Sequence, residues 1–325
     1  MAENNIVMQS KVTLSRNVSG YPFPHNLRDN RASVIAGSVY EAVCRSGNYE
    51  LYKISQISEQ KSRALVEQGL ISDALATGEN NGSAIISDDK TVSIMINEED
   101  HIVEQCYESG LNLESAFQKI DKIDDLIAEK NKICFDDKLG YLTSGPANAG
   151  TGMHASVVLF LPALVLTKNV QKCANAVNRL GITMRSVDGE GAGYLYSLTN
   201  QRTLGLTEKE IIDLVKTATG HAVTAEEQAR SLLKISSEVE IRDKASRSLG
   251  ILKSAYRLTE SEMISLVAWV KLGVSYGWVE SDCEKLDKIV SKLTTAVMVE
   301  NSGMTFATPV DRDVYRAEAV KAEIN

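Results

Sequence analysis

The chain has 325 residues and a formal net charge of −8, with 43% hydrophobic and 24% charged residues. This composition is typical of a folded globular protein that can bury one large core or two modest ones, and its acidity argues against general nucleic-acid binding. No apolar run approaches the length of a membrane span, and no signal-peptide pattern begins the sequence, so we expect a cytoplasmic protein without a membrane partner. Five dispersed cysteines without C-x-x-C spacing predict reduced thiols, with neither a disulfide frame nor a metal site.

The first two-thirds of the chain mix helix and strand patterns. Apolar residues recur with helical spacing in two early segments, and Ser58 is a suitable N-cap for the second of them. A long amphipathic helix is expected over residues 112–130, with an apolar face that includes Leu113 and Ile120. The expected helices are 32–44, 59–68 and 112–130, and the expected strands are 50–54, 92–96, 157–161 and 195–198.

From residue 207 onward the pattern becomes helical. Thr207 and Thr259 each begin a capping-box pattern, and no convincing strand follows. We therefore place a domain boundary at residue 206, with an α/β domain over 1–206 and a helical domain over 207–325. Helical spacing in the second domain covers residues 225–236, 241–256, 260–272 and 281–294.

An acidic motif follows the expected strand 92–96. Residues 97–101 read Asn-Glu-Glu-Asp-His, so three carboxylates are delivered to one strand end. Repulsion between the carboxylates and their partial removal from water make such a cluster unfavourable, unless a cation or a proton neutralises part of its charge. The simple interpretation is a solvated acidic turn, and the functional one is a carboxylate pair that steers a cationic group and takes its proton.

Three further motifs decide between these interpretations. Residues 140–152 form a glycine-containing loop that leads into 155–164, residues 185–191 read Arg-Ser-Val-Asp-Gly-Glu-Gly, and residues 200–205 read Asn-Gln-Arg-Thr-Leu-Gly. Together with the acidic motif they resemble the ATP:guanido phosphotransferases, and most closely the bacterial protein-arginine kinases. The resemblance covers nearly the whole chain. It implies an α+β fold, with a phosphagen-kinase or glutamine-synthetase-like antiparallel sheet flanked by helices, followed by an all-helical C-terminal domain.

The resemblance assigns roles to acidic residues. Phosphoryl transfer to a guanidinium requires the removal of a proton from a group with a pKa above about 12. In the family, one carboxylate orients the guanidinium and acts as the base, and its position here is Glu99. A second carboxylate grips the guanidinium and matches Glu190, and Asp100 is a third candidate beside Glu99. Each residue, taken alone, is more often a surface or salt-bridged acid.

Most of the arginines with which the family binds ATP are missing from this sequence. The family cradles ATP with arginines at five places, two of them in an N-terminal S-x-R-x-R-L-A-R-N segment. We interpret the x-R-x-R part as deleted here, with Arg16 matching only the end of the segment. Val103 and His154 replace the third and fourth arginines, and Arg185 retains the fifth. The resemblance therefore assigns Arg16, His154 and Arg185 to a vestigial ATP site, with Mg-ATP as cofactor only in an active enzyme, and Gly145 replaces a family cysteine. A plain core or surface histidine is the alternative for His154.

A last motif lies near the C-terminus. Residues 312–317 read Arg-Asp-Val-Tyr-Arg-Ala, and R-D-x-x-R-A forms a phosphoarginine pocket in the protein-arginine kinases. Arg312 and Arg316 are four apart on a helix, so both could reach one phosphate while Asp313 takes a guanidinium. The alternative is an exposed helix with internal Asp–Arg pairs.

These features lead to three functional hypotheses. The first is a degenerate family member, a pseudokinase in protein quality control that binds phosphoarginine-containing proteins. The resemblance implies a homodimer through the helical domain, and as partners an active arginine kinase and an AAA+ protease or unfoldase system. The second is an active kinase for protein arginine or another guanidino compound. The third is a structural relic that binds neither ligand.

Overall fold

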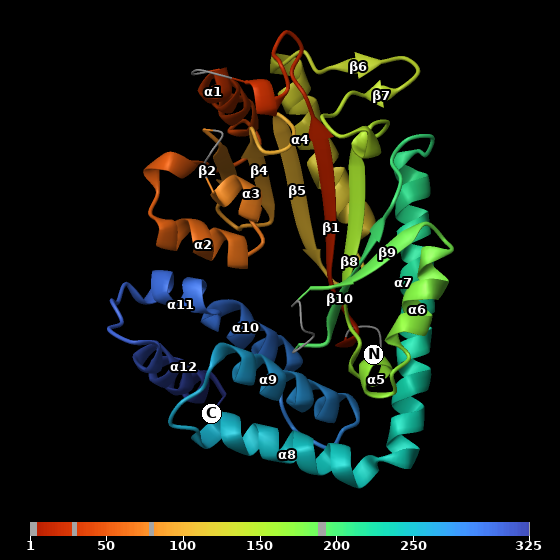
Figure 1. Cartoon of the computed structure of the whole chain (residues 1–325), viewed down its shortest axis with the longest axis vertical. Helices are drawn as coiled ribbons and strands as arrows, with labels where there is room; N and C mark the ends of the chain where they lie inside the picture. Colours follow the sequence, from red (N-terminus) through yellow and green to blue (C-terminus); the bar gives the residue numbers. More distant parts are fainter. Residues whose placement is uncertain (1–4, 28–30, 78–80, 188–192, 325) are drawn as a thin grey trace.

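The computed structural model describes residues 5–27, 31–77, 81–187 and 193–324. At the centre of the described chain lies an eight-stranded antiparallel sheet with the order β2-β3-β4-β5-β1-β8-β10-β9 (Figure 1). A two-stranded hairpin extends from it. The strands are β1 (Val7–Arg16), β2 (Tyr49–Lys53), β3 (Ser83–Ser87), β4 (Val92–Ile96), β5 (Ile102–Ser109), β6 (Phe135–Asp136), β7 (Gly140–Tyr141), β8 (Met153–Phe160), β9 (Ile182–Ser186) and β10 (Leu195–Asn200).

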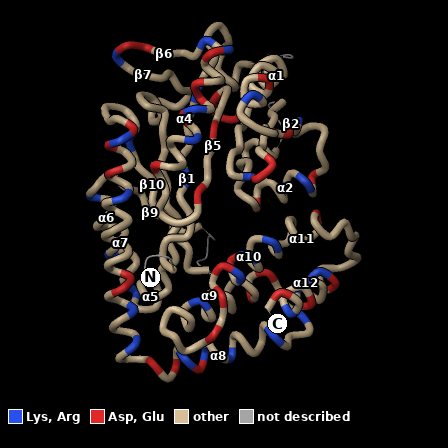
Figure 2. Tube along the Cα trace, turned by 180° about the vertical axis from the view of Figure 1, so that it is seen from behind, with Lys and Arg blue, Asp and Glu red and all other residues tan. Residues whose placement is uncertain are grey.

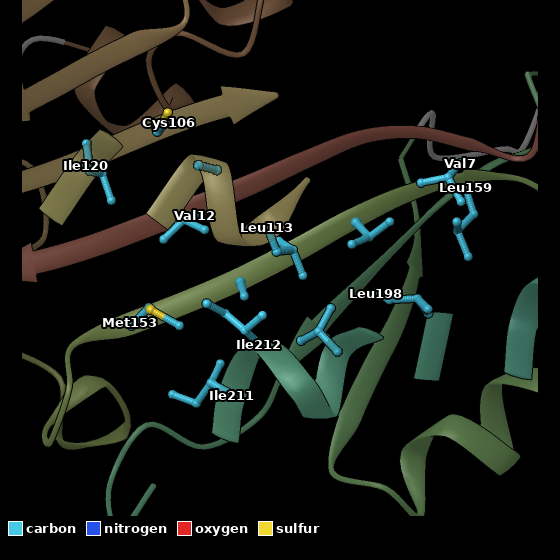
Figure 3. Packing of buried hydrophobic residues seen from close by; sticks show 14 of the residues in the cluster. Val7, Val12, Cys106, Leu113, Ile120, Met153, Leu159, Leu198, Ile211 and Ile212 are labelled. Carbon is cyan, nitrogen blue, oxygen red and sulfur yellow. The ribbon is translucent and has the colours of Figure 1, made fainter. Parts of the chain in front are cut away.

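Long helices cover one face of the sheet. α4 packs on β1 and β5, and α7 packs on β8 and β10. Alternate residues of the central strands point into this layer, and Figure 3 shows Val12 of β1 and Met153 of β8 in the same apolar cluster as Ile211 and Ile212 of α7. The helices and 3-10 turns of this part are η2 (Pro24–Asn26), α1 (Arg31–Val43), η3 (Ile54–Gln56), α2 (Glu59–Glu67), α3 (Asp73–Ala76), α4 (Leu113–Lys130), η4 (Pro146–Asn148), α5 (Pro162–Leu166), α6 (Val170–Asn178) and α7 (Glu208–Ser236).

The opposite face of the sheet is divided. Over β3 to β5, a smaller apolar cluster that includes Leu65, Leu75 and Met95 covers it with α2 and α3. Over β1, β8, β10 and β9, the outward residues are mostly polar. We call this second region the polar sheet face, and define it by Lys11, Thr13, His154, Ser156, Thr183, Arg185, Ser197 and Thr199, which the strand register places on one side of the sheet.

The C-terminal helices form a second unit with its own core. Met263, Val270 and Ala317 belong to this core, and α11 packs against α2 of the sheet part (Figure 1). Acidic and basic residues alternate along α7 and α8 (Figure 2). No helix in the described ranges is long and apolar enough to cross a membrane. The helices of this unit are α8 (Glu238–Ser254), α9 (Glu260–Ser275), α10 (Cys283–Leu293), α11 (Thr295–Ser302) and α12 (Pro309–Ile324).

The fold class expected from the sequence is confirmed: an antiparallel sheet flanked by helices precedes a helical region. The described residues from 207 on contain no strand, and Thr207 does form a capping box with Glu210. However, the helix that starts there, α7, contributes Ile211 and Val215 to the core of the sheet. The proposed boundary at 206 therefore marks where helical sequence begins, while the core of the sheet continues into α7 and also includes Ile241 of α8 and Trp269 and Leu272 of α9.

Candidate active site

The acidic motif forms a tight turn between β4 and β5. Asn97 adopts a positive φ of 60°, and its backbone N–H donates to the His101 carbonyl over 3.0 Å. Glu98 faces the N-terminus of α3, where the N-cap Ser72 donates its hydroxyl proton to Glu98 Oε1 over 2.7 Å. The turn is thus held from two sides, which leaves Glu99 projecting from its tip.

Glu99 is the exposed carboxylate of the turn. It lines a cavity of about 320 Å³ together with Glu98 and the side of Leu75. Partial burial of the carboxyl group, followed by the charges of Asp100 and Glu98, raises the pKa of Glu99. A carboxylate under this repulsion gains from binding a cation, so the position suits a guanidinium.

Asp100 lies inside the protein. It is fully buried, and its Oδ1 accepts from Asn17 Nδ2 over 2.7 Å and from the Ser144 backbone N–H over 2.6 Å. The neighbouring His101 is buried too, and Asn17 Oδ1 accepts from its backbone N–H. Asp100 was a candidate catalytic acid, but the structure places it as a positioning residue that ties the acidic turn to β1 and to the loop after β7.

Strand β1 runs without interruption from Val7 to Arg16, which corrects the sequence-based interpretation of a deletion. Counting back from Leu14-Ser15-Arg16-Asn17, Lys11 and Thr13 occupy the two arginine positions of the family's segment. In the sheet, Lys11 pairs with Ser156, and Thr13 pairs with His154. Both side chains therefore share the polar sheet face with His154.

Lys11 is a functional candidate that the sequence analysis missed. It is half-buried, and burial lowers the pKa of its ammonium group. Within the described part of the chain it has no carboxylate partner, and its Nζ lies 5.7 Å from the centre of the Tyr107 ring. The signal that could have found it is the alternation of polar and apolar residues over 11–15, which is typical of a strand. Its ammonium group could interact with an anion on the polar sheet face.

His154 is held between two oxygen atoms. Its Nε2 lies 2.9 Å from Asn148 Oδ1, and its Nδ1 lies 3.3 Å from the Asn200 carbonyl oxygen. Burial, with a smaller contribution from the charge of Lys11, lowers the pKa of His154 and favours the neutral imidazole, although the hydrogen bond to Asn200 opposes this shift. His154 thus lies where the resemblance placed it, but in the neutral form it does not replace the charge of an arginine.

The two remaining positions that the resemblance assigns to ATP-binding arginines, 185 and 103, have different environments. Arg185 is exposed on β9 and belongs to the polar sheet face. Val103, at the third arginine position, is only 7% exposed and packs in the apolar cluster with Leu75 and Met95. An apolar side chain in that cluster cannot contact a phosphate.

Arg16, also expected in the ATP site, is 3% exposed and points into the protein. Its Nη2 lies 2.7 Å from Asp124 Oδ2, its Nε also donates to Asp124, and its Nη1 donates to the carbonyls of Ser15 and Thr151. The Tyr141 ring stacks over the guanidinium, with 3.5 Å between the Arg16 Cζ and the ring centre. Arg16 therefore joins β1 to α4, and in this arrangement its donors are directed to protein acceptors.

The glycine-containing loop is fastened by Thr203. Its Oγ1 donates to the carbonyls of Ala147 and Ala149 over 3.0 and 2.6 Å. At Gly150, where φ is +101°, a Cβ atom would lie 2.6 Å from the Thr203 carbonyl oxygen. Only glycine fits there, so this close approach fixes the loop beside Glu99. Glu190, the second predicted guanidinium-facing acid, lies outside the described residues.

The C-terminal motif lies on α12, and its three charged residues have different environments. Arg316 is 1% exposed and donates to the carbonyls of Leu293 and Leu258, to Asp313 and to Thr295. Asp313 also pairs with Arg257 at 3.0 Å. The structure thus brings Asp313 and Arg316 together in an internal network.

Arg312 differs from its neighbours in the motif. It lines a hollow of about 480 Å³ with Gln60, Phe306 and Thr308, and Arg316 is not part of that lining. Among the described residues Arg312 has no ion pair or hydrogen bond. The expected convergence of both guanidinium groups is therefore absent in this arrangement, and Arg312 alone is available to a ligand.

Comparison with known proteins supports the same assignment. Residues 33–229 match the family model described as ATP:guanido phosphotransferase, C-terminal catalytic domain, and residues 238–325 match the protein-arginine kinase McsB C-terminal domain. A protein-arginine kinase of Halothermothrix orenii is 38% identical over 99% of this chain and 94% of its own length. One of Caldanaerobacter subterraneus subsp. tengcongensis is 37% identical over 99% of this chain and 98% of its own length.

Solved structures agree on the fold. A lombricine kinase is similar with a TM-score of 0.62 at 20% sequence identity, over 70% of this chain and 68% of its own. The duplicated taurocyamine kinase of Schistosoma mansoni has a TM-score of 0.64 at 22% identity, over 80% of this chain and 39% of its own. Together, the site, both family models and full-length relatives at this identity show that the chain belongs to the ATP:guanido phosphotransferase family, in its bacterial protein-arginine kinase branch.

Proposed function

We propose that this chain is a protein-arginine kinase family member that binds arginine- or phosphoarginine-bearing proteins and lacks efficient phosphoryl transfer from Mg-ATP. The observation that carries the proposal is the composition of the polar sheet face. At the family's five arginine positions this chain has Lys11, Thr13, Val103, His154 and Arg185, so two basic side chains, Lys11 and Arg185, remain. These residues do not fit a triphosphate.

The binding free energy that is lost with the missing arginines supports this conclusion. A charge-assisted hydrogen bond contributes about 1.5–3 kcal/mol, so three missing arginines remove on the order of 5–9 kcal/mol if they act independently. One arginine at a phosphoryl transition state can contribute about 10³–10⁵ in rate. Glu99, in contrast, still lines a cavity. Its pKa is raised by burial and by the charges of Asp100 and Glu98, and a bound guanidinium would offset this repulsion.

The hollow at Arg312 supports phosphoarginine as the ligand of the C-terminal unit. A guanidinium without an internal partner can bind one phosphate through two parallel hydrogen bonds. Thr308 and Gln60 add polar groups to the lining, and the Phe306 ring adds an apolar wall. Glu300, in the same lining, could accept from the guanidinium of the ligand.

We also propose the assembly that the family implies, namely a homodimer through the helical unit. Leu232, Ile235 and Val239, near the junction of α7 and α8, are 62%, 85% and 80% exposed. Burial of such residues against a second copy would be favourable. An active arginine kinase and an AAA+ protease or unfoldase are proposed as further partners in protein quality control.

A calorimetric titration with Mg-ATP tests the central claim. We expect no saturable heat at millimolar nucleotide, and no acid-labile phosphate on arginine after incubation with Mg-ATP and an arginine-rich protein. Phosphoarginine detected by mass spectrometry, and lost in Glu99→Ala, would instead establish the second candidate, an active protein-arginine kinase. That alternative is favoured by the shared location of Lys11 and Arg185 on the polar sheet face.

A further inference from the structure

A hollow of about 510 Å³ lies where the residues before β1, the last turns of α7 and the end of α9 meet. The carbonyl of Ile6 accepts from the Phe160 N–H over 2.8 Å, which fixes the start of β1 beside the end of β8. At the other end of β1, Arg16 pairs with Ile102 next to the acidic turn. A ten-residue strand spans about 30 Å, so the hollow and Glu99 lie at opposite ends of β1 (Figure 1).

One face of α7 supplies most of the charged groups of this hollow. Residues at positions i, i+3, i+4 and i+7 of a helix share a face, and the four in the lining are Glu227, Arg230, Ser231 and Lys234. Arg230 and Lys234 are four positions apart, and two like charges at this spacing repel each other. Lys234 is exposed and forms no ion pair with the described residues. A negative group in the hollow would offset this repulsion.

Only one of the three guanidinium nitrogens of Arg230 donates a hydrogen bond to a described residue. Nε donates to Glu226 Oε1 over 2.8 Å, and the side chain is 11% exposed. Glu226 also accepts from the backbone N–H groups of Ala163 and Leu164, so its charge is shared among three donors. The Nη2 of Arg230 is enclosed without an acceptor, which is unfavourable for a charged donor. An anion that reached the guanidinium would supply the missing acceptor.

The carboxylate of Glu227 restricts the kind of anion that fits. Glu227 is exposed and lines the hollow three positions before Arg230. A carboxylate only accepts hydrogen bonds, so it repels an anion without protons and can accept from an anion that has an O–H group. Free phosphate retains a proton at neutral pH and sulfate retains none, while phosphate esters lose their second proton at about pH 6. The lining therefore favours free phosphate.

We propose that this hollow binds inorganic phosphate, with Arg230 and Lys234 as hydrogen-bond donors and Glu227 as the acceptor for the proton that phosphate retains. The hollow shares no lining residue with the one at Arg312, and the proposal does not depend on the proposed function. Since α7 packs on the sheet and α9 contributes to the core of the helical unit, a bound phosphate would connect the two parts of the chain.

Trp278 provides a local signal for the test. Its ring stacks on Tyr276 with 4.3 Å between the ring centres, and Tyr276 lines the hollow. The chain has two tryptophans, so Trp269→Phe leaves Trp278 as the single emitter. Sodium phosphate is titrated into this full-length variant at pH 7 and constant ionic strength, with sodium sulfate as the matched ligand. We expect a saturable change in emission with phosphate and weaker binding of sulfate, and calorimetry on the wild type should give the same phosphate affinity.

Substitutions on α7 test the individual roles. Lys234→Ala should weaken phosphate binding about ten-fold, the effect of losing one charge-assisted hydrogen bond. Lys209→Ala is the matched control, because Lys209 is an exposed lysine of the same helix outside the hollow, and it should bind like the wild type. Glu227→Gln should let sulfate bind about as tightly as phosphate, since the glutamine amide can donate to an anion without protons.

The inference is overturned if phosphate gives no saturable signal, or if Lys234→Ala binds phosphate like the Lys209→Ala control. An unchanged preference for phosphate over sulfate in Glu227→Gln would also overturn it. If Lys234→Ala loses the same stability with and without phosphate, Lys234 only complements the negative end of the α7 dipole, and the phosphate site is wrong. None of these outcomes involves nucleotide or arginine, so the proposed function is tested separately.

Discussion

At the scale of single residues, the interior beneath the acidic turn contains a compact ionic group. Arg16 and Asp124 are both buried, and Glu104 lies beside them on β5 with no exposed surface. A buried ion pair must offset a large desolvation cost through close geometry and further hydrogen bonds. Arg16 meets this condition through its paired contacts with Asp124 and two backbone carbonyls.

Removal of one member of this ion pair should destabilise the fold. We expect Arg16→Ala to lower the free energy of unfolding by about 3–5 kcal/mol, because Asp124 would remain buried without its partner. Urea denaturation measures the change. Arg45→Ala is the matched control, since its ion pair with Glu129 is about half exposed and should contribute less than about 1 kcal/mol. Equal losses in both variants would contradict this account.

Because Glu104 is buried, we expect the free energy of unfolding to depend on pH. Burial, then the negative charge of Asp124, raises the pKa of Glu104 well above its ordinary value, although Arg16 opposes the shift. The folded state thus keeps a proton that the unfolded state releases above about pH 4.5, so this residue lowers stability as pH rises towards the folded-state pKa. Glu104→Gln should unfold at higher urea concentration than the wild type near pH 7, and the two should converge near pH 4. A constant difference across this range would exclude the explanation.

At the scale of elements, α11 connects the helical unit to the sheet part. Its first backbone N–H groups, at Ala296 and Val297, donate to Glu67 Oε2 of α2 over 2.8 and 3.1 Å. Glu260 of α9 accepts from the N–H of Thr295. An acidic side chain at a helix N-terminus satisfies free donors and complements the helix dipole. The two acids, Glu67 of α2 and Glu260 of α9, belong to different helices, so this cap also fixes the packing of α11 on α2.

Glu67→Ala should therefore loosen α11. The expected loss of stability is about 1–2 kcal/mol, the usual contribution of a helix cap. Amide hydrogen exchange should accelerate in residues 295–302 more than in α12. Glu59→Ala is the control, because Glu59 belongs to the same helix but is 80% exposed in its pair with Arg63, and its exchange pattern should match the wild type. Faster exchange throughout the chain would indicate general unfolding instead.

At the scale of the whole molecule, the C-terminal motif contains one buried arginine, Arg316, and one arginine that lines a hollow, Arg312. Arg316 binds carbonyls at the ends of α10 and before α9, so it connects three helices of the unit. Arg312, on the same helix, faces the hollow between α12 and α2. The hollow combines residues from both parts of the chain, which makes any ligand there sensitive to their arrangement.

The two arginines should respond differently to substitution. Arg316→Ala should lower the free energy of unfolding by about 3–5 kcal/mol, because Asp313 and several carbonyls lose a buried partner. Arg312→Ala should leave thermal unfolding within about 0.5 kcal/mol of the wild type, and should abolish calorimetric binding of free phosphoarginine. If Arg312→Ala binds phosphoarginine normally, the hollow is not the binding site.

Local patterns in the sequence determined much of this molecule. Strand 92–96 and helix 112–130 follow from apolar periodicity, and the acidic motif identified Glu99 at a strand end, because these signals depend on neighbours in the chain. The family resemblance fixed the fold class. The start of helical sequence at Thr207 was also correct, since a capping box is local chemistry.

Only the tertiary structure decided which charged residues are available. Arg16 and Arg316 looked like ligand-binding arginines in the sequence, yet both are buried by contacts with residues more than a dozen positions away. The position of Lys11 on the polar sheet face follows from its register with Ser156, and the contact of His154 with Asn148 depends on the folding of one loop against another strand. Burial and pairing of a charge depend on long-range packing, whereas periodicity and capping depend on residues a few positions apart.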